Sequence, residues 1–345
     1  MDSVINHIAI VGDGKMGTSL FHYLSQFDFK IIWIHITDPE KAKKKYHRKL
    51  NRALKNDLIN QTEFDFKSDN HLITNDLSSV SESDLIIECI FEDLYAKRKL
   101  VHDLFEIKTP KAIIATNSSS IFPDSLSDLD LQKQKILGVH FFFPVETKAM
   151  VELIPSGFNN NNDLQKVQLF LNAISKRVLI QDGNDAFLLN RIMLKWQALA
   201  YNYFMESDYS FAQIDIVVSK HLGCMGIFEM MDFIGLDLIY KSSNTYVEGQ
   251  DDKELYRLLL DFLKTKTEAN QIGVKTNEGF YTYPQNSDIE SLSVEQEQEI
   301  LQKLLKDFKL IMDWAKSLSS STDEDLEFCM NEYLDTNIKN WKKLV

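Results

Sequence analysis

Three glycines near the start of the chain could hold a nucleotide. They lie in the run HIAIVGDGKMGTSL, spaced as G-x-G-x-x-G between a β-rich stretch and a helical pattern. The first glycine of such a turn permits a tight bend, the second lets the backbone approach a pyrophosphate, and the third allows close helix–strand packing. The helix N-terminus adds free N–H groups and a partial positive charge. The predicted cofactor contacts here are Gly12, Gly14, Lys15, Met16 and Gly17.

The acid that normally completes such a site is missing from its usual place. It should lie about 20 residues further on, at the end of the second strand, where it would accept hydrogen bonds from the adenosine ribose of NAD. The residue there is His35, and Asp38 follows three residues later as the cap of a helix that starts with Pro39. An imidazole can accept one hydrogen bond, but it does not repel a 2′-phosphate as a carboxylate does. We expect NAD, with His35 at the ribose, and leave NADP open; a histidine without a ligand role is the alternative.

Alternating strands and helices must position this turn. Strands are predicted at HIAIVG, KIIWIHI (30–36), DLIIECI (84–90), KAIIAT (111–116) and KILGVHFFF (135–143), and helices at 15–26 and 40–57. Short apolar runs that alternate with helices indicate a doubly wound parallel sheet. We therefore predict a Rossmann-type α/β domain over residues 1–183.

The second half of the chain shows almost only helical periodicity. Helices are expected at 190–206, 210–221, 235–247, 253–271, 294–318 and 322–334, so an all-α domain follows. We assign residues 184–284 to this domain and 285–345 to an extra helical segment. Residues 190–218 can be laid over 302–330 without a gap, with Ser210 and Thr322 as matching caps, which suggests a degenerate repeat; chance similarity of two amphipathic hairpins is the alternative.

Composition excludes several classes of protein. The 345 residues, 44% of them hydrophobic, suffice for two domains with their own cores. A net charge of −13 argues against a nucleic-acid partner. The three cysteines are too far apart for a zinc site or a disulfide framework, which fits a reducing cytoplasm. We expect no signal segment, no membrane span and no metal.

One of the eight histidines is placed where a base would be useful. His140 ends a buried strand, and ligands of doubly wound sheets bind at the carboxyl ends of the strands. Histidine is suited to removing a proton near neutral pH. From its position alone, a histidine that merely packs in the core is the more common case.

Six ordered blocks resemble the L-3-hydroxyacyl-CoA dehydrogenase family, in that family's order and spacing. They are ECIFEDLYAKRKLVHDL, AIIATNSSSI, GVHFFFPVETKAMVELI, FLLNRIM, MGIFEMMDFIGLD and GVKTNEGFYTY, and the resemblance spans roughly residues 5–284. It implies NAD(P)-dependent interconversion of an L-3-hydroxyacyl-CoA and a 3-ketoacyl-CoA, as in the β-oxidation of fatty acids. It also implies a homodimer formed by the helical domain, or a monomer if the extra segment covers that surface.

The resemblance also assigns roles to particular residues. By the family's pattern His140 is the general base, Glu152 orients it, and Ser119 and Asn190 hydrogen-bond the substrate oxygen. Further cofactor contacts matched in this way are Glu92, Lys97 and Asn117. These types suit the chemistry, because a carboxylate behind a histidine fixes its tautomer and stabilises the imidazolium, and neutral donors polarise the reacting oxygen.

Some positions depart from the family pattern. Phe143 replaces an asparagine beside the pocket, and Ile227 replaces a proline at a helix start. A sibling dehydrogenase for a small 3-hydroxy acid without CoA, such as carnitine or a sugar acid, is therefore one alternative. A nucleotide-binding paralogue without catalysis is another. The basic helix 40–57 could meet CoA phosphates through a lysine of 41–55, or be a solvated face.

Overall fold

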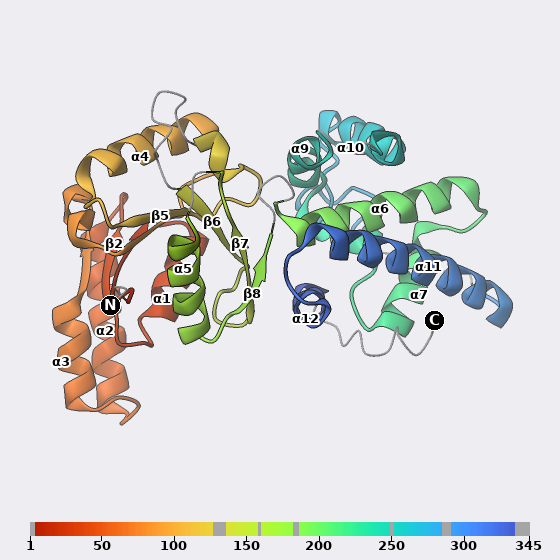
Figure 1. Ribbon diagram of the computed structural model, residues 1–345. Helices are drawn as coiled ribbons and strands as arrows, with labels where there is room; N and C mark the ends of the chain where they lie inside the picture. The colour runs from red at the N-terminus through yellow and green to blue at the C-terminus, as the bar shows by residue number, and fades with distance from the viewer. Residues whose placement is uncertain are drawn as a thin grey trace. The chain divides into compact units, whose positions relative to one another are not determined.

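The computed structural model describes residues 4–126, 136–157, 160–181, 186–248, 252–284 and 291–334. Backbone contacts divide the chain into two units, Met1–Ala186 and Phe187–Val345 (Figure 1). The domain boundary expected after residue 183 falls within 182–185, outside the described residues.

The first unit is built on an eight-stranded sheet. Its strands are β1 His7–Val11, β2 Lys30–Ile34, β3 His71–Thr74, β4 Leu85–Glu88, β5 Ile113–Thr116, β6 Ile136–Phe141, β7 Met150–Ile154 and β8 Arg177–Ile180. They are ordered β3-β2-β1-β4-β5-β6-β7-β8, and all neighbours run parallel except β6 and β7. The order from β3 to β6 is that of a dinucleotide-binding sheet, which confirms the predicted doubly wound fold.

Helices cover both faces of this sheet. They are α1 Lys15–Leu24, α2 Pro39–Lys55, α3 Gln61–Asn70, α4 Leu94–Ile107 and α5 Asn161–Ala173, with short 3-10 turns η1 Leu77–Glu82 and η2 Pro123–Leu126. Side chains alternate along β1, so Ile8 and Ile10 pack with α1 and α5, whereas Ala9 and Val11 pack with α4 and η1. As predicted, Asp38 caps α2 by accepting the N–H of Lys41.

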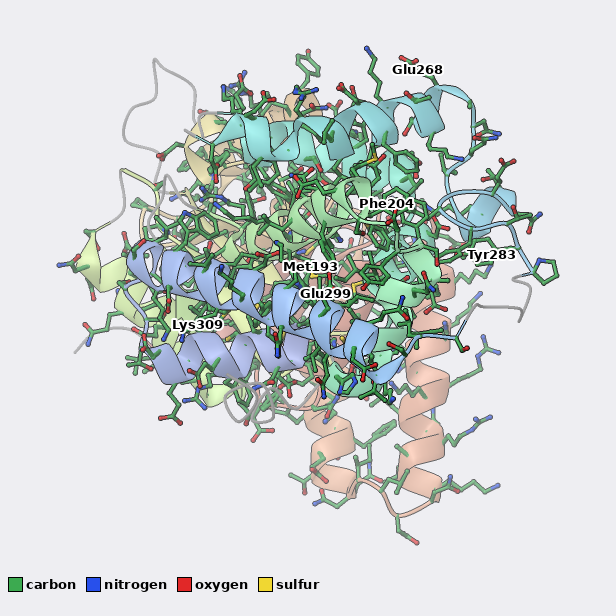
Figure 2. The ribbon with its side chains drawn as sticks, turned by 90° about the vertical axis from the view of Figure 1, so that its right-hand side faces the viewer. Met193, Phe204, Glu268, Tyr283, Glu299 and Lys309 are labelled. Carbon is green, nitrogen blue, oxygen red and sulfur yellow. The ribbon has the colours of Figure 1, made fainter. Side chains whose placement is uncertain are left out.

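The second unit is helical. Its elements are α6 Leu188–Glu206, α7 Phe211–Leu222, α8 Ile227–Ile234, α9 Leu236–Val247, η5 Lys253–Tyr256, α10 Arg257–Glu268, η6 Val274–Thr276, α11 Val294–Leu318 and α12 Asp323–Leu334. The long helix α6 is its centre, packed between α10 and α11 (Figure 2). Because α6 has neighbours on opposite sides, most of its residues are buried.

Side-chain caps determine where several of these helices begin. Ser210 and Thr322 accept the N–H groups of Gln213 and Asp325, as the sequence predicted. The N-terminus of α8 is capped from a distance, since Asp215 accepts the N–H groups of Phe228 and Glu229. A proline at position 227 is therefore not needed to start this helix. The helix pairs α6–α7 and α11–α12 share their cap placement, and their origin as a repeat stays a prediction.

No single helix within the described ranges is long and apolar enough to cross a membrane; Phe211–Leu222 and Ile227–Ile234 pass that test only as a pair, bent by 101°.

Candidate active site

The glycine turn has the shape that a pyrophosphate requires. Gly12 has φ of +133°, and a Cβ there would lie 2.5 Å from the carbonyl oxygen of Cys89, while a Cβ at Gly17 would overlap the backbone of Gly12. A Cβ at Gly14 would meet no atom within 4 Å, and no side chain caps the first turn of α1, which begins at Lys15. Gly12 and Gly17 are thus fixed by the fold, whereas the open backbone at Gly14 and the helix N-terminus fit the phosphates of NAD.

A small polar cluster occupies the end of β2. His35 Nδ1 lies 3.2 Å from Asp13 Oδ2, and the same carboxylate oxygen accepts the backbone N–H and the hydroxyl of Thr37, both at 2.7 Å. Asp13 comes from the glycine turn, between Gly12 and Gly14. The histidine predicted at the ribose therefore has an acid directly beside it, which sequence reasoning missed.

His140 and Glu152 form a buried pair on two neighbouring strands. The residues stand directly opposite each other in the antiparallel register of β6 and β7, and His140 Nδ1 lies 2.7 Å from Glu152 Oε2. His140 is 5% exposed and Glu152 0%. With the carboxylate ionised, Nδ1–H donates to it, which leaves Nε2 as the nitrogen that can take a proton. The pairing inferred from the family pattern is thus geometrically present.

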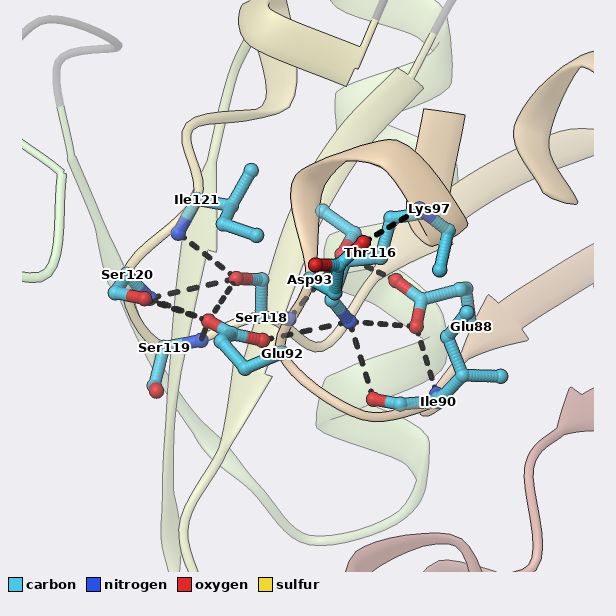
Figure 3. A network of polar contacts seen from close by, with 11 residues as sticks. Glu88, Ile90, Glu92, Asp93, Lys97, Thr116, Ser118, Ser119, Ser120 and Ile121 are labelled. Atoms are coloured by element: carbon cyan, nitrogen blue, oxygen red, sulfur yellow. Dashed lines mark hydrogen bonds and ion pairs between the residues drawn. The ribbon is translucent and has the colours of Figure 1, made fainter. Parts of the chain in front are cut away.

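A second buried pair fixes the start of α4 (Figure 3). Lys97 Nζ donates to Glu88 Oε1 at 2.6 Å and to the carbonyl of Ile90 at 3.2 Å, and Thr116 Oγ1 donates to Glu88 Oε2 at 2.7 Å. Lys97 is 1% exposed and Glu88 0%. Lys97, predicted as a cofactor contact, forms an internal anchor between α4 and the ends of β4 and β5; its contact with the cofactor stays a prediction. Glu88 was not predicted, although an acid inside the apolar run DLIIECI was a signal.

Glu92 joins this anchor to the serine loop after β5 (Figure 3). Its Oε1 accepts the N–H groups of Ser119 and Ser120, at 3.1 and 3.0 Å, and the hydroxyls of Ser118 and Ser120. Its Oε2 lies 3.4 Å from Lys97 Nζ. Burial alone would raise the pKa of Glu92, but Lys97 and the serine donors outweigh it and hold the pKa below its ordinary value. An ionised Glu92 therefore fixes the backbone that carries Ser119.

The remaining predicted residues link these groups. Asn117 Oδ1 accepts the N–H of Phe141 at 2.9 Å, which ties the end of β5 to the residue after His140. Ser119 is exposed on the first unit, and Phe143 is 53% exposed just beyond β6. The carboxyl ends of β1, β2, β4, β5 and β6 thus bring the predicted residues of the first unit to one edge of the sheet, the edge at which such folds bind ligands.

Asn190 belongs to the second unit, in the first turn of α6. Its Nδ2 donates to the hydroxyl of Tyr246 at 3.0 Å, and its Oδ1 accepts from the hydroxyl of Tyr333 at 2.9 Å. Neither tyrosine was singled out in the sequence. Within the described ranges, no three His, Cys, Asp or Glu side chains are grouped so that they could hold a metal ion.

Comparison with known proteins identifies the family to which both units are similar. Residues 7–184 match the NAD binding domain of 3-hydroxyacyl-CoA dehydrogenase, and residues 187–283 match its C-terminal domain. The 3-hydroxybutyryl-CoA dehydrogenase of Bradyrhizobium diazoefficiens is 28% identical, over 82% of this chain and 97% of the relative.

Two solved structures share the fold. FadB2 of M. tuberculosis has a TM-score of 0.67 and 23% identity, over 81% of this chain and 100% of its own. The dehydrogenase part of multifunctional enzyme 1 from C. elegans has a TM-score of 0.60 and 20% identity, over 96% of this chain and 79% of its own. With both domains matched in order over most of its length, the chain belongs to the 3-hydroxyacyl-CoA dehydrogenase family.

Proposed function

We propose that this protein interconverts an L-3-hydroxyacyl-CoA and the corresponding 3-ketoacyl-CoA with NAD, using His140 as the general base. The observation that carries the proposal is the buried His140–Glu152 pair at the ligand-binding edge of the sheet. Family membership supports NAD and the oxidoreductase class, and the names of the relatives support an acyl-CoA substrate.

The chemistry needs one proton and one hydride to leave a secondary alcohol. Bound NAD supplies the hydride acceptor. His140 Nε2 takes the hydroxyl proton, while Glu152 holds Nδ1–H and stabilises the imidazolium that forms. In the reverse direction the imidazolium returns its proton to the ketone oxygen. Ser119 is a neutral donor for the oxygen on which charge develops, and Asn190 keeps the substrate-binding role that the family pattern assigns to it.

The basic surface of α2 is consistent with an anionic CoA ester. Its buried residues are Tyr46 and Leu50, so the lysines and arginines of 41–55 lie mostly on the opposite, solvent-facing side. The three phosphates of CoA are one partner for that side, and water is the other.

The test is turnover of acetoacetyl-CoA with NADH by the wild type and by His140→Ala. We expect the variant to lose about three orders of magnitude in turnover, since it lacks the acid–base group, and to bind NADH as before. His102→Ala is the matched control, because that side chain is 57% exposed. A His140→Ala variant with wild-type rates would refute the base assignment. Activity on free 3-hydroxy acids but not on CoA esters would instead support the sibling dehydrogenase.

For the oligomeric state we propose a homodimer by default, with a monomer as the alternative. The alternative has support in α11, which packs along α6: the rings of Trp196 and Phe308 are 5.2 Å apart, and the Lys195 ammonium lies 4.3 Å from the centre of the Trp314 ring. Light scattering on the full chain decides between the two.

A further inference from the structure

The end of β2 has an acid beside it, contributed by Asp13 of the glycine turn. His35 occupies the place where a dinucleotide-binding sheet usually carries a carboxylate. A carboxylate is nevertheless present there, because Asp13 extends from the glycine turn to within 2.7 Å of the Thr37 N–H and 3.2 Å of His35 Nδ1. The acid is absent from its usual sequence position and present in space.

The surroundings hold Asp13 in this place. Trp33 Nε1 donates to the carbonyl of Gly12 at 2.8 Å, and the ring of Trp33 packs edge-on against His35, with centroids 4.8 Å apart. The glycine turn is therefore joined to β2 by the Trp33 hydrogen bond as well as by the Asp13 carboxylate. Burial raises the pKa of Asp13, but the hydrogen bonds from Thr37 and the nearby His35 outweigh it and leave the pKa below its ordinary value. The group is ionised at neutral pH.

We propose that Asp13 takes over the role of the strand-end acid and makes the site selective for nucleotides with a free ribose 2′-hydroxyl. A 2′-hydroxyl donates a hydrogen bond to a carboxylate, whereas a 2′-phosphate is repelled by it. If Asp13 only held the 35–38 loop together, a neutral amide at this position would do so equally well. This inference rests on the nucleotide site of the proposed dehydrogenase and not on its substrate or its base.

The experiment measures binding, not turnover. Dissociation constants of NADH, NADPH, 5′-AMP and adenosine 2′,5′-bisphosphate are determined for the wild type, Asp13→Asn and Asp38→Asn by calorimetry. Asn keeps an acceptor for Thr37, and Asp38→Asn removes a nearby negative charge while retaining a good helix cap. We expect the wild type to prefer NADH and 5′-AMP by about 100-fold, Asp13→Asn to lose about tenfold or more of that preference, and Asp38→Asn to keep it.

Two results would overturn the inference. One is a wild-type protein that binds NADPH and adenosine 2′,5′-bisphosphate as tightly as NADH and 5′-AMP, a result that can be obtained without any variant. The other is a folded Asp13→Asn protein with an unchanged preference, which would leave the proposed dehydrogenase intact. A wild type that binds none of the four nucleotides would refute the dehydrogenase and this inference together.

A separate observation concerns the segment after residue 284. Helix α11 packs along α6, and α12 then brings Tyr333 to the start of α6, where its hydroxyl donates to Asn190 Oδ1 at 2.9 Å. On the other side of the amide, Nδ2 donates to the hydroxyl of Tyr246 at 3.0 Å. The side chain of Asn190 is therefore held at both ends, once from within the matched family domain and once from outside it.

We infer that Tyr333 is a positioning residue, which keeps the Asn190 amide oriented so that Nδ2 remains a donor for the substrate oxygen. This inference rests on the proposed role of Asn190. Tyr333→Phe removes only the hydroxyl. Its control is Tyr209→Phe, which removes a hydrogen bond of similar length, 3.0 Å, from Tyr209 to Glu299 of α11, at a place away from Asn190.

Steady-state kinetics with acetoacetyl-CoA and NADH distinguish positioning from stability. We expect Tyr333→Phe to lower kcat about three- to tenfold, whereas Tyr209→Phe keeps the wild-type kcat. The KM for NADH and the melting temperature should be similar in the two variants. Equal kcat values for the two variants would overturn the inference and leave the dehydrogenase assignment standing. An inactive wild type would refute both.

Discussion

The carboxylate of Glu152 provides the most direct test of the proposed chemistry. Replacing it with Gln keeps the size of the side chain and one oxygen acceptor but removes the charge. The site cannot compensate with water, because Glu152 is 0% exposed and its partner His140 only 5%. The substitution therefore isolates what the charge contributes to the protonated histidine.

The magnitude follows from the geometry. His140 Nδ1 and Glu152 Oε2 are 2.7 Å apart, which puts the centres of the two delocalised charges about 4 Å apart. Two full charges at that separation interact by about 4 kcal/mol at an effective dielectric constant of about 20. With the proton about half transferred in the transition state, the loss is about 2 kcal/mol, or about 30-fold in rate. The amide can also turn its NH2 toward Nδ1 and favour the wrong tautomer, which extends the loss to about 1000-fold.

The assay combines steady-state turnover of acetoacetyl-CoA with a fluorescence titration of NADH. We expect kcat of Glu152→Gln to fall by about 30- to 1000-fold, with unchanged affinity for NADH. Glu152→Asp, which keeps the charge on a shorter side chain, should recover part of the loss. A Glu152→Gln enzyme within about threefold of the wild-type kcat would refute the reasoning, and so would a loss confined to NADH affinity.

Three further predictions concern the glycine turn, the buried Lys97–Glu88 pair and the Asp215 cap of α8. Gly14→Ala should keep the melting temperature but weaken NADH binding about tenfold. Gly17→Ala should lower the free energy of unfolding by about 3 kcal/mol or more, because a Cβ at Gly17 overlaps the backbone of Gly12 whereas a Cβ at Gly14 meets no atom. Similar melting curves for the two variants would contradict this. Lys97→Met should cost about 3–5 kcal/mol in urea unfolding by leaving Glu88 buried without its cation, and a cost below about 1 kcal/mol would contradict it. Burial raises the pKa of Asp215 to about 6, above its unfolded value of 3.8. The native state therefore binds this proton more tightly, and the stability of wild type relative to Asp215→Asn should fall by about 3 kcal/mol from about pH 4 to about pH 7; a difference that does not change with pH would refute it.

Helices whose starts carry a local capping signal could be predicted from the sequence. Asp38 with Pro39 marked the start of α2, and the predicted helix 294–318 is confirmed as α11, whose first turn is capped by Ser293. The strands β3, β7 and β8 were not predicted. They have only four or five residues each, β7 carries Glu152 at its centre, and β8 begins at Arg177. Their burial comes from the sheet, which a local pattern does not reveal.

The site divides in the same way. The glycine turn could be recognised from spacing alone, because its chemistry lies in the backbone of consecutive residues. The partnership of His140 with Glu152 required the family pattern, since it depends on the register of two antiparallel strands. Glu88 and Asp13 were missed because each acts on a group that is near in space: Lys97 of α4 in the first case, and the end of β2 in the second.

The edge of the sheet that should receive NAD and an acyl-CoA, both of them polyanions, carries carboxylates. Those of Asp13, Glu88, Glu92 and Glu152 belong to the groups described above. Each is held by donors of the chain, with an ammonium, an imidazole or a set of N–H and O–H groups directed at it, so its charge is compensated locally. Such carboxylates can accept a hydrogen bond from a ligand hydroxyl or orient a base without repelling phosphate groups at longer range. The groups that fit the phosphates carry no negative charge: they are the open backbone at Gly14 and the N-terminus of α1. On this reasoning, acids at this edge contribute to selectivity only where a ligand comes within hydrogen-bonding distance of them, which is why a single carboxylate can separate two cofactors that differ by one phosphate.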